Sequence, residues 1–235
     1  MSLVKILSVL TGQITPFRAP DEPSAIAKSP RTGAIAVGPL GLACDEQADR
    51  VHHGGPDKAI HHYPHDHYAF WRGGIGDHPL LAAPGGFGEN IATLGLIETE
   101  VCIGDRFRLG TALVEVSHGR KPCWKISHRF GLPKLTAQVV KTGRAGWYYR
   151  VLEQGLVQAD DRIELIERVL PEWTIERTFD LIVRGAGKTD PAALRALAGM
   201  EVLAAAWRES ASKALASSSP SLPRGGGSPH RLRSG

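Results

Sequence analysis

The residues best suited to chemistry surround Cys123, in the segment Arg120–Lys125 (RKPCWK). Three cations within three residues of the sulfur are expected to favour the thiolate, the form that acts as nucleophile and metal ligand. The alternative is a buried structural cysteine, because free cysteines are among the most buried residues. Cys44 and Cys102 have no such basic setting, and Cys102 lies in an apolar run typical of a core strand. Cys123 is therefore the candidate reactive thiol.

A second candidate is the segment HGGPDK at residues 53–58. Adjacent glycines allow backbone N–H groups to approach a ligand closely, and a following lysine adds a cation. His53, Gly54, Gly55 and Lys58 are thus predicted to cradle an anion such as a phosphate, although a plain tight turn is also consistent with the pattern. A further Gly-rich turn, GFGEN, ends at Asn90, whose amide can both donate to and accept from the edge of a heterocycle.

Seven of the ten histidines lie between residues 52 and 78, which suggests a zinc site at first sight. The spacings 61/65 and 65/67 nearly fit a ligand pair, but no Cys or Glu completes a convincing set. A solvated or hydrogen-bonding His-rich loop is the favoured interpretation. It covers His61, His62, His65, His67 and His78.

Composition excludes several classes of protein. The 235 residues are 42% hydrophobic and 22% charged, which predicts one large domain with or without a small appendage. No apolar run reaches the ~20 residues that a membrane span requires. The net charge is +4, and Arg224, Arg231 and Arg233 in the tail supply three of these charges, so a nucleic-acid-binding surface is not indicated. Three cysteines and no export signal suggest a reduced, cytoplasmic protein.

Short apolar runs separated by Gly and Pro predict a mostly β barrel or sandwich over residues 1–170. The expected strands are Val4–Leu10, Val101–Leu109 and Ala112–Ser117 (a hairpin turning at Gly110-Thr111), and the pair Trp147–Leu152 and Arg162–Glu167. Two short helices are expected, at Pro64–Trp71 and Pro133–Lys141.

After residue 170 the pattern changes to helices. Thr174 and Asp190 are typical N-caps, with Pro191 at a first helical position, and Glu201–Leu215 is an Ala-rich helix former. Residues 171–216 are therefore predicted to form a three-helix unit. Residues 217–235, rich in Ser, Pro and Gly, are predicted to be a disordered tail.

The order of these segments resembles the MOSC-domain family, named for the C-terminus of molybdenum cofactor sulfurase, and within it the bacterial hydroxylaminopurine-reductase branch. The resemblance runs collinearly over about residues 10–168. It rests on the segments SAIAK (24–28), LGL (40–42), DEQAD (45–49), HGGPDKA (53–59), HYP (62–64), GFGEN (86–90), Gly104-Asp105, Arg120, Pro122-Cys123, Thr142-Gly143 and Gly146-Trp147. Cys44 departs from the family pattern, which commonly has Gly there, so a different turn is expected.

The resemblance implies a MOSC-type β-barrel-like domain that binds the molybdenum cofactor, molybdopterin-bound molybdenum, with Cys123 as the metal ligand and catalytic residue. It implies that the pocket lining includes Lys28, His53, Gly54, Gly55, Lys58, Asn90, Ser117 and Arg120. The implied activity is reduction of N-hydroxylated compounds, such as hydroxylaminopurine bases, to amines by a cytoplasmic enzyme that receives electrons from a reductase, with neither a nucleic-acid polymer nor a membrane as partner. A non-catalytic cofactor carrier or sulfur-transfer module remains the alternative.

Overall fold

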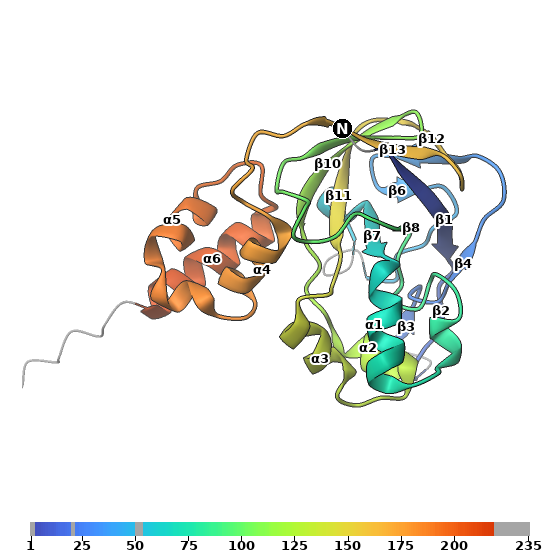
Figure 1. Ribbon diagram of the computed structural model, residues 1–235, viewed down its shortest axis with the longest axis horizontal. Helices are drawn as coiled ribbons and strands as arrows, with labels where there is room; N and C mark the ends of the chain where they lie inside the picture. The colour runs from blue at the N-terminus through green and yellow to red at the C-terminus, as the bar shows by residue number, and fades with distance from the viewer. Residues whose placement is uncertain (1–2, 20–21, 50–53, 219–235) are drawn as a thin grey trace, which may run out of the picture.

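The computed structural model describes residues 3–19, 22–49 and 54–218. A closed seven-strand barrel forms its centre (Figure 1). Around the barrel the order is β13 (Arg162–Glu167), β9 (Arg106–Leu109), β10 (Ala112–Gly119), β11 (Trp147–Glu153), β7 (Ile60–Pro64), β8 (Ile91–Thr93) and β1 (Val4–Gly12). The ring closes where β1 pairs with β13, and only β7 and β8 run parallel among these neighbours. Closure removes the exposed edges that an open sheet would leave.

Smaller strands flank the barrel. β4 (Lys28–Pro30) pairs with the end of β1, and β12 (Gly155–Val157), β5 (Ile35–Gly38) and β6 (Gly41–Leu42) form a three-stranded sheet. β2 (Thr15–Pro16) pairs with β3 (Pro23–Ser24). These segments and the loops between them bring polar residues from distant parts of the chain to one end of the barrel.

Helices gather in two groups in Figure 1. The first holds α1 (Asp66–Ile75), α2 (Trp124–Phe130) and α3 (Leu135–Thr142), with the short 3₁₀ helix η2 (Pro79–Leu81) packed against α1, while the 3₁₀ helix η1 (Pro56–Lys58) lies beside β11. The second holds α4 (Ile175–Ile182), η3 (Ala186–Thr189), α5 (Pro191–Ala198) and α6 (Ala205–Ser218). The expected mostly β domain followed by a three-helix unit is confirmed.

The C-terminal helices pack directly against β10. The Trp207 ring stacks on His118, with centroids 5.5 Å apart and planes 10° apart. The backbone N–H of Ala204 donates to the Ser117 carbonyl, and Arg150 donates to the Val202 carbonyl. This contact explains why α6 begins at Ala205, four residues after the predicted start at Glu201: the preceding turn is used to join the barrel.

Local capping signals were good guides to the helices. The Thr174 hydroxyl accepts from the Arg177 N–H at the start of α4, and the Asp190 carboxylate accepts from the Ala193 N–H at the start of α5. Gly143 ends α3 in the left-handed conformation. Helix α6 continues to Ser218, two residues into the segment predicted to be a disordered tail, and residues 219–235 lie outside the described residues.

Two strand predictions were wrong. Within Val101–Leu109 only Arg106–Leu109 is a strand, because the Asp105 carboxylate accepts the Cys102 N–H and forms a turn; Cys102 itself makes one isolated bridge to Thr174. β11 and β13 do not pair with each other. The strand β12 lies between them in the sequence but belongs to another sheet, and β13 pairs with β9 and β1. The apolar pattern of a segment does not indicate which distant strand it pairs with.

The His-rich segment is also not a solvated loop. His61 and His62 lie in the buried strand β7, and His67 in α1 contacts the Glu98 carboxylate at 2.6 Å. The His62 ring bridges the hydroxyls of Tyr149 and Thr93. The expectation of hydrogen bonding was thus correct, whereas the expectation of exposure was wrong. Among the described residues no three His, Cys, Asp or Glu side chains are grouped to hold a metal ion.

Burial lowers the pKa of His62 to about 3 and that of His118 to about 4. Both rings stay neutral in the fold but gain a proton near their ordinary value when unfolded, so stability is full above pH ~6.5 and falls as the pH drops towards the folded pKa values. Between the folded and unfolded pKa values, each histidine changes the free energy of unfolding by about 1.4 kcal/mol per pH unit. We expect the urea concentration at the midpoint of unfolding to decrease when the pH is lowered from about 7 to about 5.

The matched control is His118→Phe, which keeps a ring against Trp207 but removes one titrating group. Its unfolding free energy should depend less steeply on pH than that of the unmodified chain. Equal slopes for the two proteins would contradict the assignment of this acid sensitivity to the buried rings.

Candidate functional site

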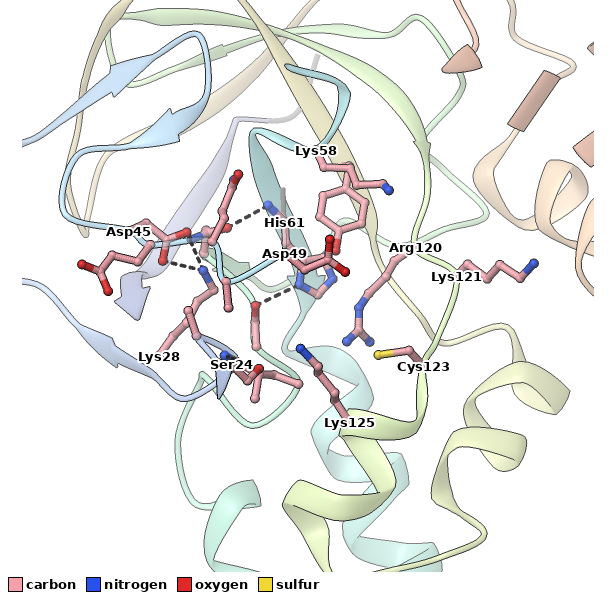
Figure 2. A pocket seen from close by; sticks show the side chains of 18 residues that line it. Ser24, Lys28, Asp45, Asp49, Lys58, His61, Arg120, Lys121, Cys123 and Lys125 are labelled. Carbon is pink, nitrogen blue, oxygen red and sulfur yellow. Dashed lines mark hydrogen bonds and ion pairs between the residues drawn. The ribbon is translucent and has the colours of Figure 1, made fainter. Parts of the chain in front are cut away.

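A pocket opens over His61 of β7 and Tyr148 of β11, between the segment that precedes β8 and the segment that follows β10 (Figure 2). The space inside it, together with its open mouth, is about 690 Å³. We call it the mouth pocket. Its lining residues are Ser24, Ala25, Ile26, Lys28, Asp45, Glu46, Gln47, Ala48, Asp49, Lys58, His61, Gly88, Asn90, Arg120, Lys121, Cys123, Lys125 and Tyr148.

One wall of the mouth pocket is organised by the Asp45 carboxylate. Both of its oxygens contact Lys28 Nζ at 2.5 Å, and it also accepts from the Asn90 side-chain amide at 2.8 Å and the Gly12 N–H at 2.7 Å. The Asn90 oxygen in turn accepts from the His61 N–H. Burial lowers the pKa of Lys28, and the neighbouring Asp45 opposes that shift. This wall is therefore polar, rigid and close to charge-neutral.

Cys44, immediately before Asp45, has a φ of 63°, the left-handed region in which glycine is most at ease. The turn that presents Asp45 thus uses a conformation suited to the family's glycine at this position.

The Gly-rich turn before β8 depends on Glu89, which is fully buried. Its carboxylate accepts from the Tyr68 hydroxyl and from the N–H groups of Gly85 and Phe87. Gly88 lines the pocket with a φ of 77°, and a Cβ there would lie 2.6 Å from the Ile26 side chain. Glu89 therefore shapes the turn, while Gly88 and Asn90 are the members of the motif that reach the pocket.

The opposite wall is rich in cations, because Arg120, Lys121 and Lys125 line it beside Cys123. Arg120 follows β10 and is only 6% exposed, and its Nη1 has no hydrogen-bond partner among the described residues. In Figure 2 its guanidinium and the sulfur of Cys123 point towards the same part of the pocket. Leaving a buried cationic donor without a partner costs free energy, so this atom indicates a place for an anionic or strongly accepting ligand.

Tyr148 and His61 lie beside this guanidinium. Burial raises the pKa of Tyr148, which keeps its hydroxyl protonated, while a hydrogen bond from Arg120 acts in the opposite direction. The His61 ring lies 5.1 Å from the Tyr148 ring, and burial and the nearby Arg120 keep its pKa well below the ordinary value. Burial also lowers the pKa of Lys58.

Cys123 is half-buried and stands at the first turn of α2. Its carbonyl accepts a 3.0 Å hydrogen bond from the Thr136 hydroxyl of α3, whose N–H donates to the Ser127 hydroxyl of α2. The hydrogen bonds between α2 and α3 therefore hold the backbone of the cysteine in place.

The structure brings five of the residues named from sequence to one cavity: Lys28, Lys58, Asn90, Arg120 and Cys123. Gly54, Gly55 and Ser117 do not line it. Gly55, with a φ of 94°, leads into η1, and the Ser117 hydroxyl donates to the carbonyls of Asp57 and Tyr148. His53 lies outside the described residues.

Several lining residues had no chemical role in the sequence analysis, among them Asp45, His61 and Tyr148. Asp45 stood in a segment that resembles the family, which was a usable signal. His61 was hidden among its histidine neighbours, and Tyr148 looked like one more residue of an apolar strand.

Residues 49–164 match the MOSC domain. YiiM of Escherichia coli (strain K12) is 42% identical over 163 residues, 69% of this chain and 72% of that protein. A protein named "Reductase" from Gibberella moniliformis is 40% identical over 153 residues, 65% of this chain but 27% of that longer protein. The crystal structure of YiiM from Geobacillus stearothermophilus superposes with a TM-score of 0.77 at 32% identity, covering 90% of this chain and 99% of that one.

The role of Asp45 in this wall can be tested through protein stability, without a ligand. Asp45→Asn keeps the shape but leaves the Lys28 ammonium buried without its counter-charge, so we expect a loss of about 3 kcal/mol in the free energy of unfolding. Urea denaturation measures it. Adding Lys28→Met should recover part of the loss, because the unpaired charge is then gone; a double variant less stable than Asp45→Asn alone would contradict this account.

Proposed function

This chain belongs to the MOSC-domain family, and from that premise we propose that it is a cytoplasmic, molybdenum-cofactor-dependent oxidoreductase that reduces N-hydroxylated compounds, such as hydroxylaminopurine bases, to amines. The family is associated with molybdenum-cofactor binding, and relatives include YiiM and a protein named as a reductase. No helix in the described ranges is long and apolar enough to cross a membrane.

The observation that carries the proposal is that one pocket holds a half-buried thiol and a buried guanidinium, one nitrogen of which has no hydrogen-bond partner among the described residues. A soft thiolate suits molybdenum, and arginine suits the oxygens of a phosphate. The donor set of the mouth pocket therefore fits a molybdopterin: Cys123 would hold the metal, and Arg120 with Lys58 would hold the anionic part. When bound, the cofactor would supply the two-electron redox chemistry.

The neutral wall suits the other part of such a ligand. Asn90 is locked by hydrogen bonds from its side-chain nitrogen to the Leu10 carbonyl and to Asp45, so the remaining acceptor position of its oxygen is held in place before a ligand arrives. A pterin edge carries N–H donors, one of which this fixed oxygen can accept.

Reduction of an N–OH group releases its oxygen as water, which requires a proton at that oxygen. We assign this role to Tyr148, which lines the pocket and stays protonated because burial raises its pKa, although the same rise weakens the hydroxyl as an acid. The Arg120 guanidinium beside it would stabilise the negative charge left on the oxygen after transfer. His61, held neutral by burial, has less capacity to supply that proton at neutral pH.

Cys123→Ser tests the metal ligand. Produced in a host that makes the cofactor, the variant should contain little molybdenum and lose turnover of 6-N-hydroxylaminopurine driven by reduced methyl viologen, with its thermal unfolding unchanged. Molybdenum and pterin are measured in the purified protein, and Cys44→Ser, at an exposed cysteine, is the control. Full activity in Cys123→Ser would refute the assignment. Full cofactor content without turnover in the unmodified chain would indicate a carrier.

Tyr148→Phe tests the proton donor separately. Cofactor content should be retained while kcat falls by roughly 10²–10⁴-fold, the ordinary contribution of general acid catalysis. The pH profile is the diagnostic reading, because the variant should regain rate as the solvent becomes more acidic. A variant with unchanged kcat, or one whose cofactor content falls in proportion to its rate, would assign this hydroxyl no role in proton transfer.

A further inference from the structure

The charges of the chain are unevenly distributed around Cys123. Residues 116–152 contain eight of the 28 Lys and Arg residues and none of the 24 acids. The remainder of the chain consequently has 20 cations and 24 acids. The net charge of +4 therefore hides a strongly basic segment on an otherwise acidic protein.

Two of these eight cations are used inside the fold. Arg120 lines the mouth pocket, and Arg150 pairs with Asp57 and Glu115. The other six form no ion pair within the described part of the chain and lie on or beside α2 and α3; we call them the α2–α3 surface. They are Lys121, Lys125, Arg129, Lys134, Lys141 and Arg144.

The hydrogen-bond and ring contacts recorded for this surface are with uncharged groups, although Glu89 also acts electrostatically on Arg129. Arg129 donates to the carbonyls of Gly85 and Gly86, and Arg144 lies 3.9 Å from the centre of the Phe70 ring. Lys121, Lys134 and Lys141 are exposed. Glu22, which feels the charge of Lys125, is paired with Arg18.

An exposed aromatic residue stands next to these cations. Trp124, directly after Cys123, is 40% exposed and packs against Phe17 and His128. An aromatic anchor with a charged rim is a common composition for a protein-binding patch. Because Thr136 of α3 binds the Cys123 carbonyl, a protein seated on this surface would rest on the element that carries the thiol.

The proposed reaction creates a need for a partner. Reduction of R–NH–OH to R–NH₂ and water consumes two electrons and two protons. An iron–sulfur cluster takes about four cysteine ligands, and the chain has three cysteines, far apart in sequence. The electrons must therefore reach the pocket from a separate donor.

We propose that the α2–α3 surface is the docking site for an acidic electron-transfer protein, carrying a flavin or an iron–sulfur cluster, that delivers electrons to the site at Cys123. This inference rests on the proposed function. Opposite charge would steer the donor towards the mouth of the pocket and raise the rate of encounter, an effect that weakens with salt. Two of its lysines, Lys121 and Lys125, line the mouth pocket, so the surface adjoins the reacting site, as docking for electron transfer requires.

A nucleic acid is the other polyanion that could meet such a surface. The acid excess over the rest of the chain disfavours it, because nucleic-acid binding draws on contacts with many phosphates along an extended basic face. An acidic protein needs only a patch of limited area.

The test compares Lys134→Glu/Lys141→Gln, on α3, with Lys188→Glu/Arg195→Gln, on η3 and α5. Both pairs are exposed, lie outside the mouth pocket and change the net charge by the same amount. Turnover of 6-N-hydroxylaminopurine is measured with a reduced acidic flavodoxin, with a reduced acidic [2Fe–2S] ferredoxin and with reduced methyl viologen. Binding of each oxidised donor protein and of a single-stranded oligonucleotide is measured in parallel.

We expect the α3 variant to lose at least about tenfold in kcat/KM for an acidic protein donor at low salt, and to bind that donor more weakly. Its viologen-driven rate should equal that of the unmodified chain, and the control variant should be unchanged in both assays. Raising the salt concentration should reduce the difference in kcat/KM for the protein donor between the unmodified chain and the α3 variant.

Equal donor kinetics for the two variants, or loss of oligonucleotide binding with intact donor turnover, would overturn the proposal. An α3 variant that slows viologen-driven turnover as much as donor-driven turnover would also overturn it, because the site rather than docking would then be affected. If the unmodified chain shows no viologen-driven turnover, the proposed function fails instead, and donor binding alone then decides whether this surface recognises the acidic protein.

Discussion

The mouth pocket depends above all on one buried carboxylate. Asp45 binds the end of β1 through Gly12, the start of β4 through Lys28 and the approach to β8 through Asn90. A carboxylate is costly to bury unless its oxygens are occupied, so it draws these three segments to one point and holds them there. Asn90 extends the network to β7 through the His61 N–H. One wall is thereby made rigid and nearly neutral, which leaves the charge of the opposite wall, around Arg120 and Cys123, available to a ligand.

The two walls illustrate how the same residue types can have different uses. Lys28 and Arg120 are both cations in the pocket, but Lys28 is satisfied by Asp45, whereas one nitrogen of Arg120 is buried without a partner in the described chain. Satisfied polar groups position their neighbours, and unsatisfied ones indicate where a ligand completes the structure. This difference cannot be seen in a sequence, in which both residues are simply basic side chains near motifs that resemble one family.

Prediction from sequence succeeded where the controlling interactions were local. Thr174, Asp190 and Gly143 begin or end helices as expected, because capping is decided within three or four residues. It failed where the decisive contacts were distant. The His-rich strand β7 became a barrel strand because β11 and β8 flank it, and β13 pairs with β1 across nearly the whole chain. At the site, Cys123 and Arg120 were recognisable from their neighbours and from the family resemblance. The contribution of Tyr148 was not, since only folding places that strand residue beside the arginine.

The charge distribution shows a related limit of composition. A balance of +4, three charges of which come from the tail, indicated no special surface, yet an acid-free segment of eight cations surrounds the candidate metal ligand. The fold explains why that segment stays together. β10 ends at the pocket, α2 and α3 turn back on each other through the Ser127–Thr136 hydrogen bonds, and β11 returns the chain to the barrel. The one segment between β10 and β11 therefore contains the thiol, the two helices that hold it and the basic surface. Because α3 is hydrogen-bonded to the backbone of Cys123, recognition of a partner and geometry of the site share one structural element.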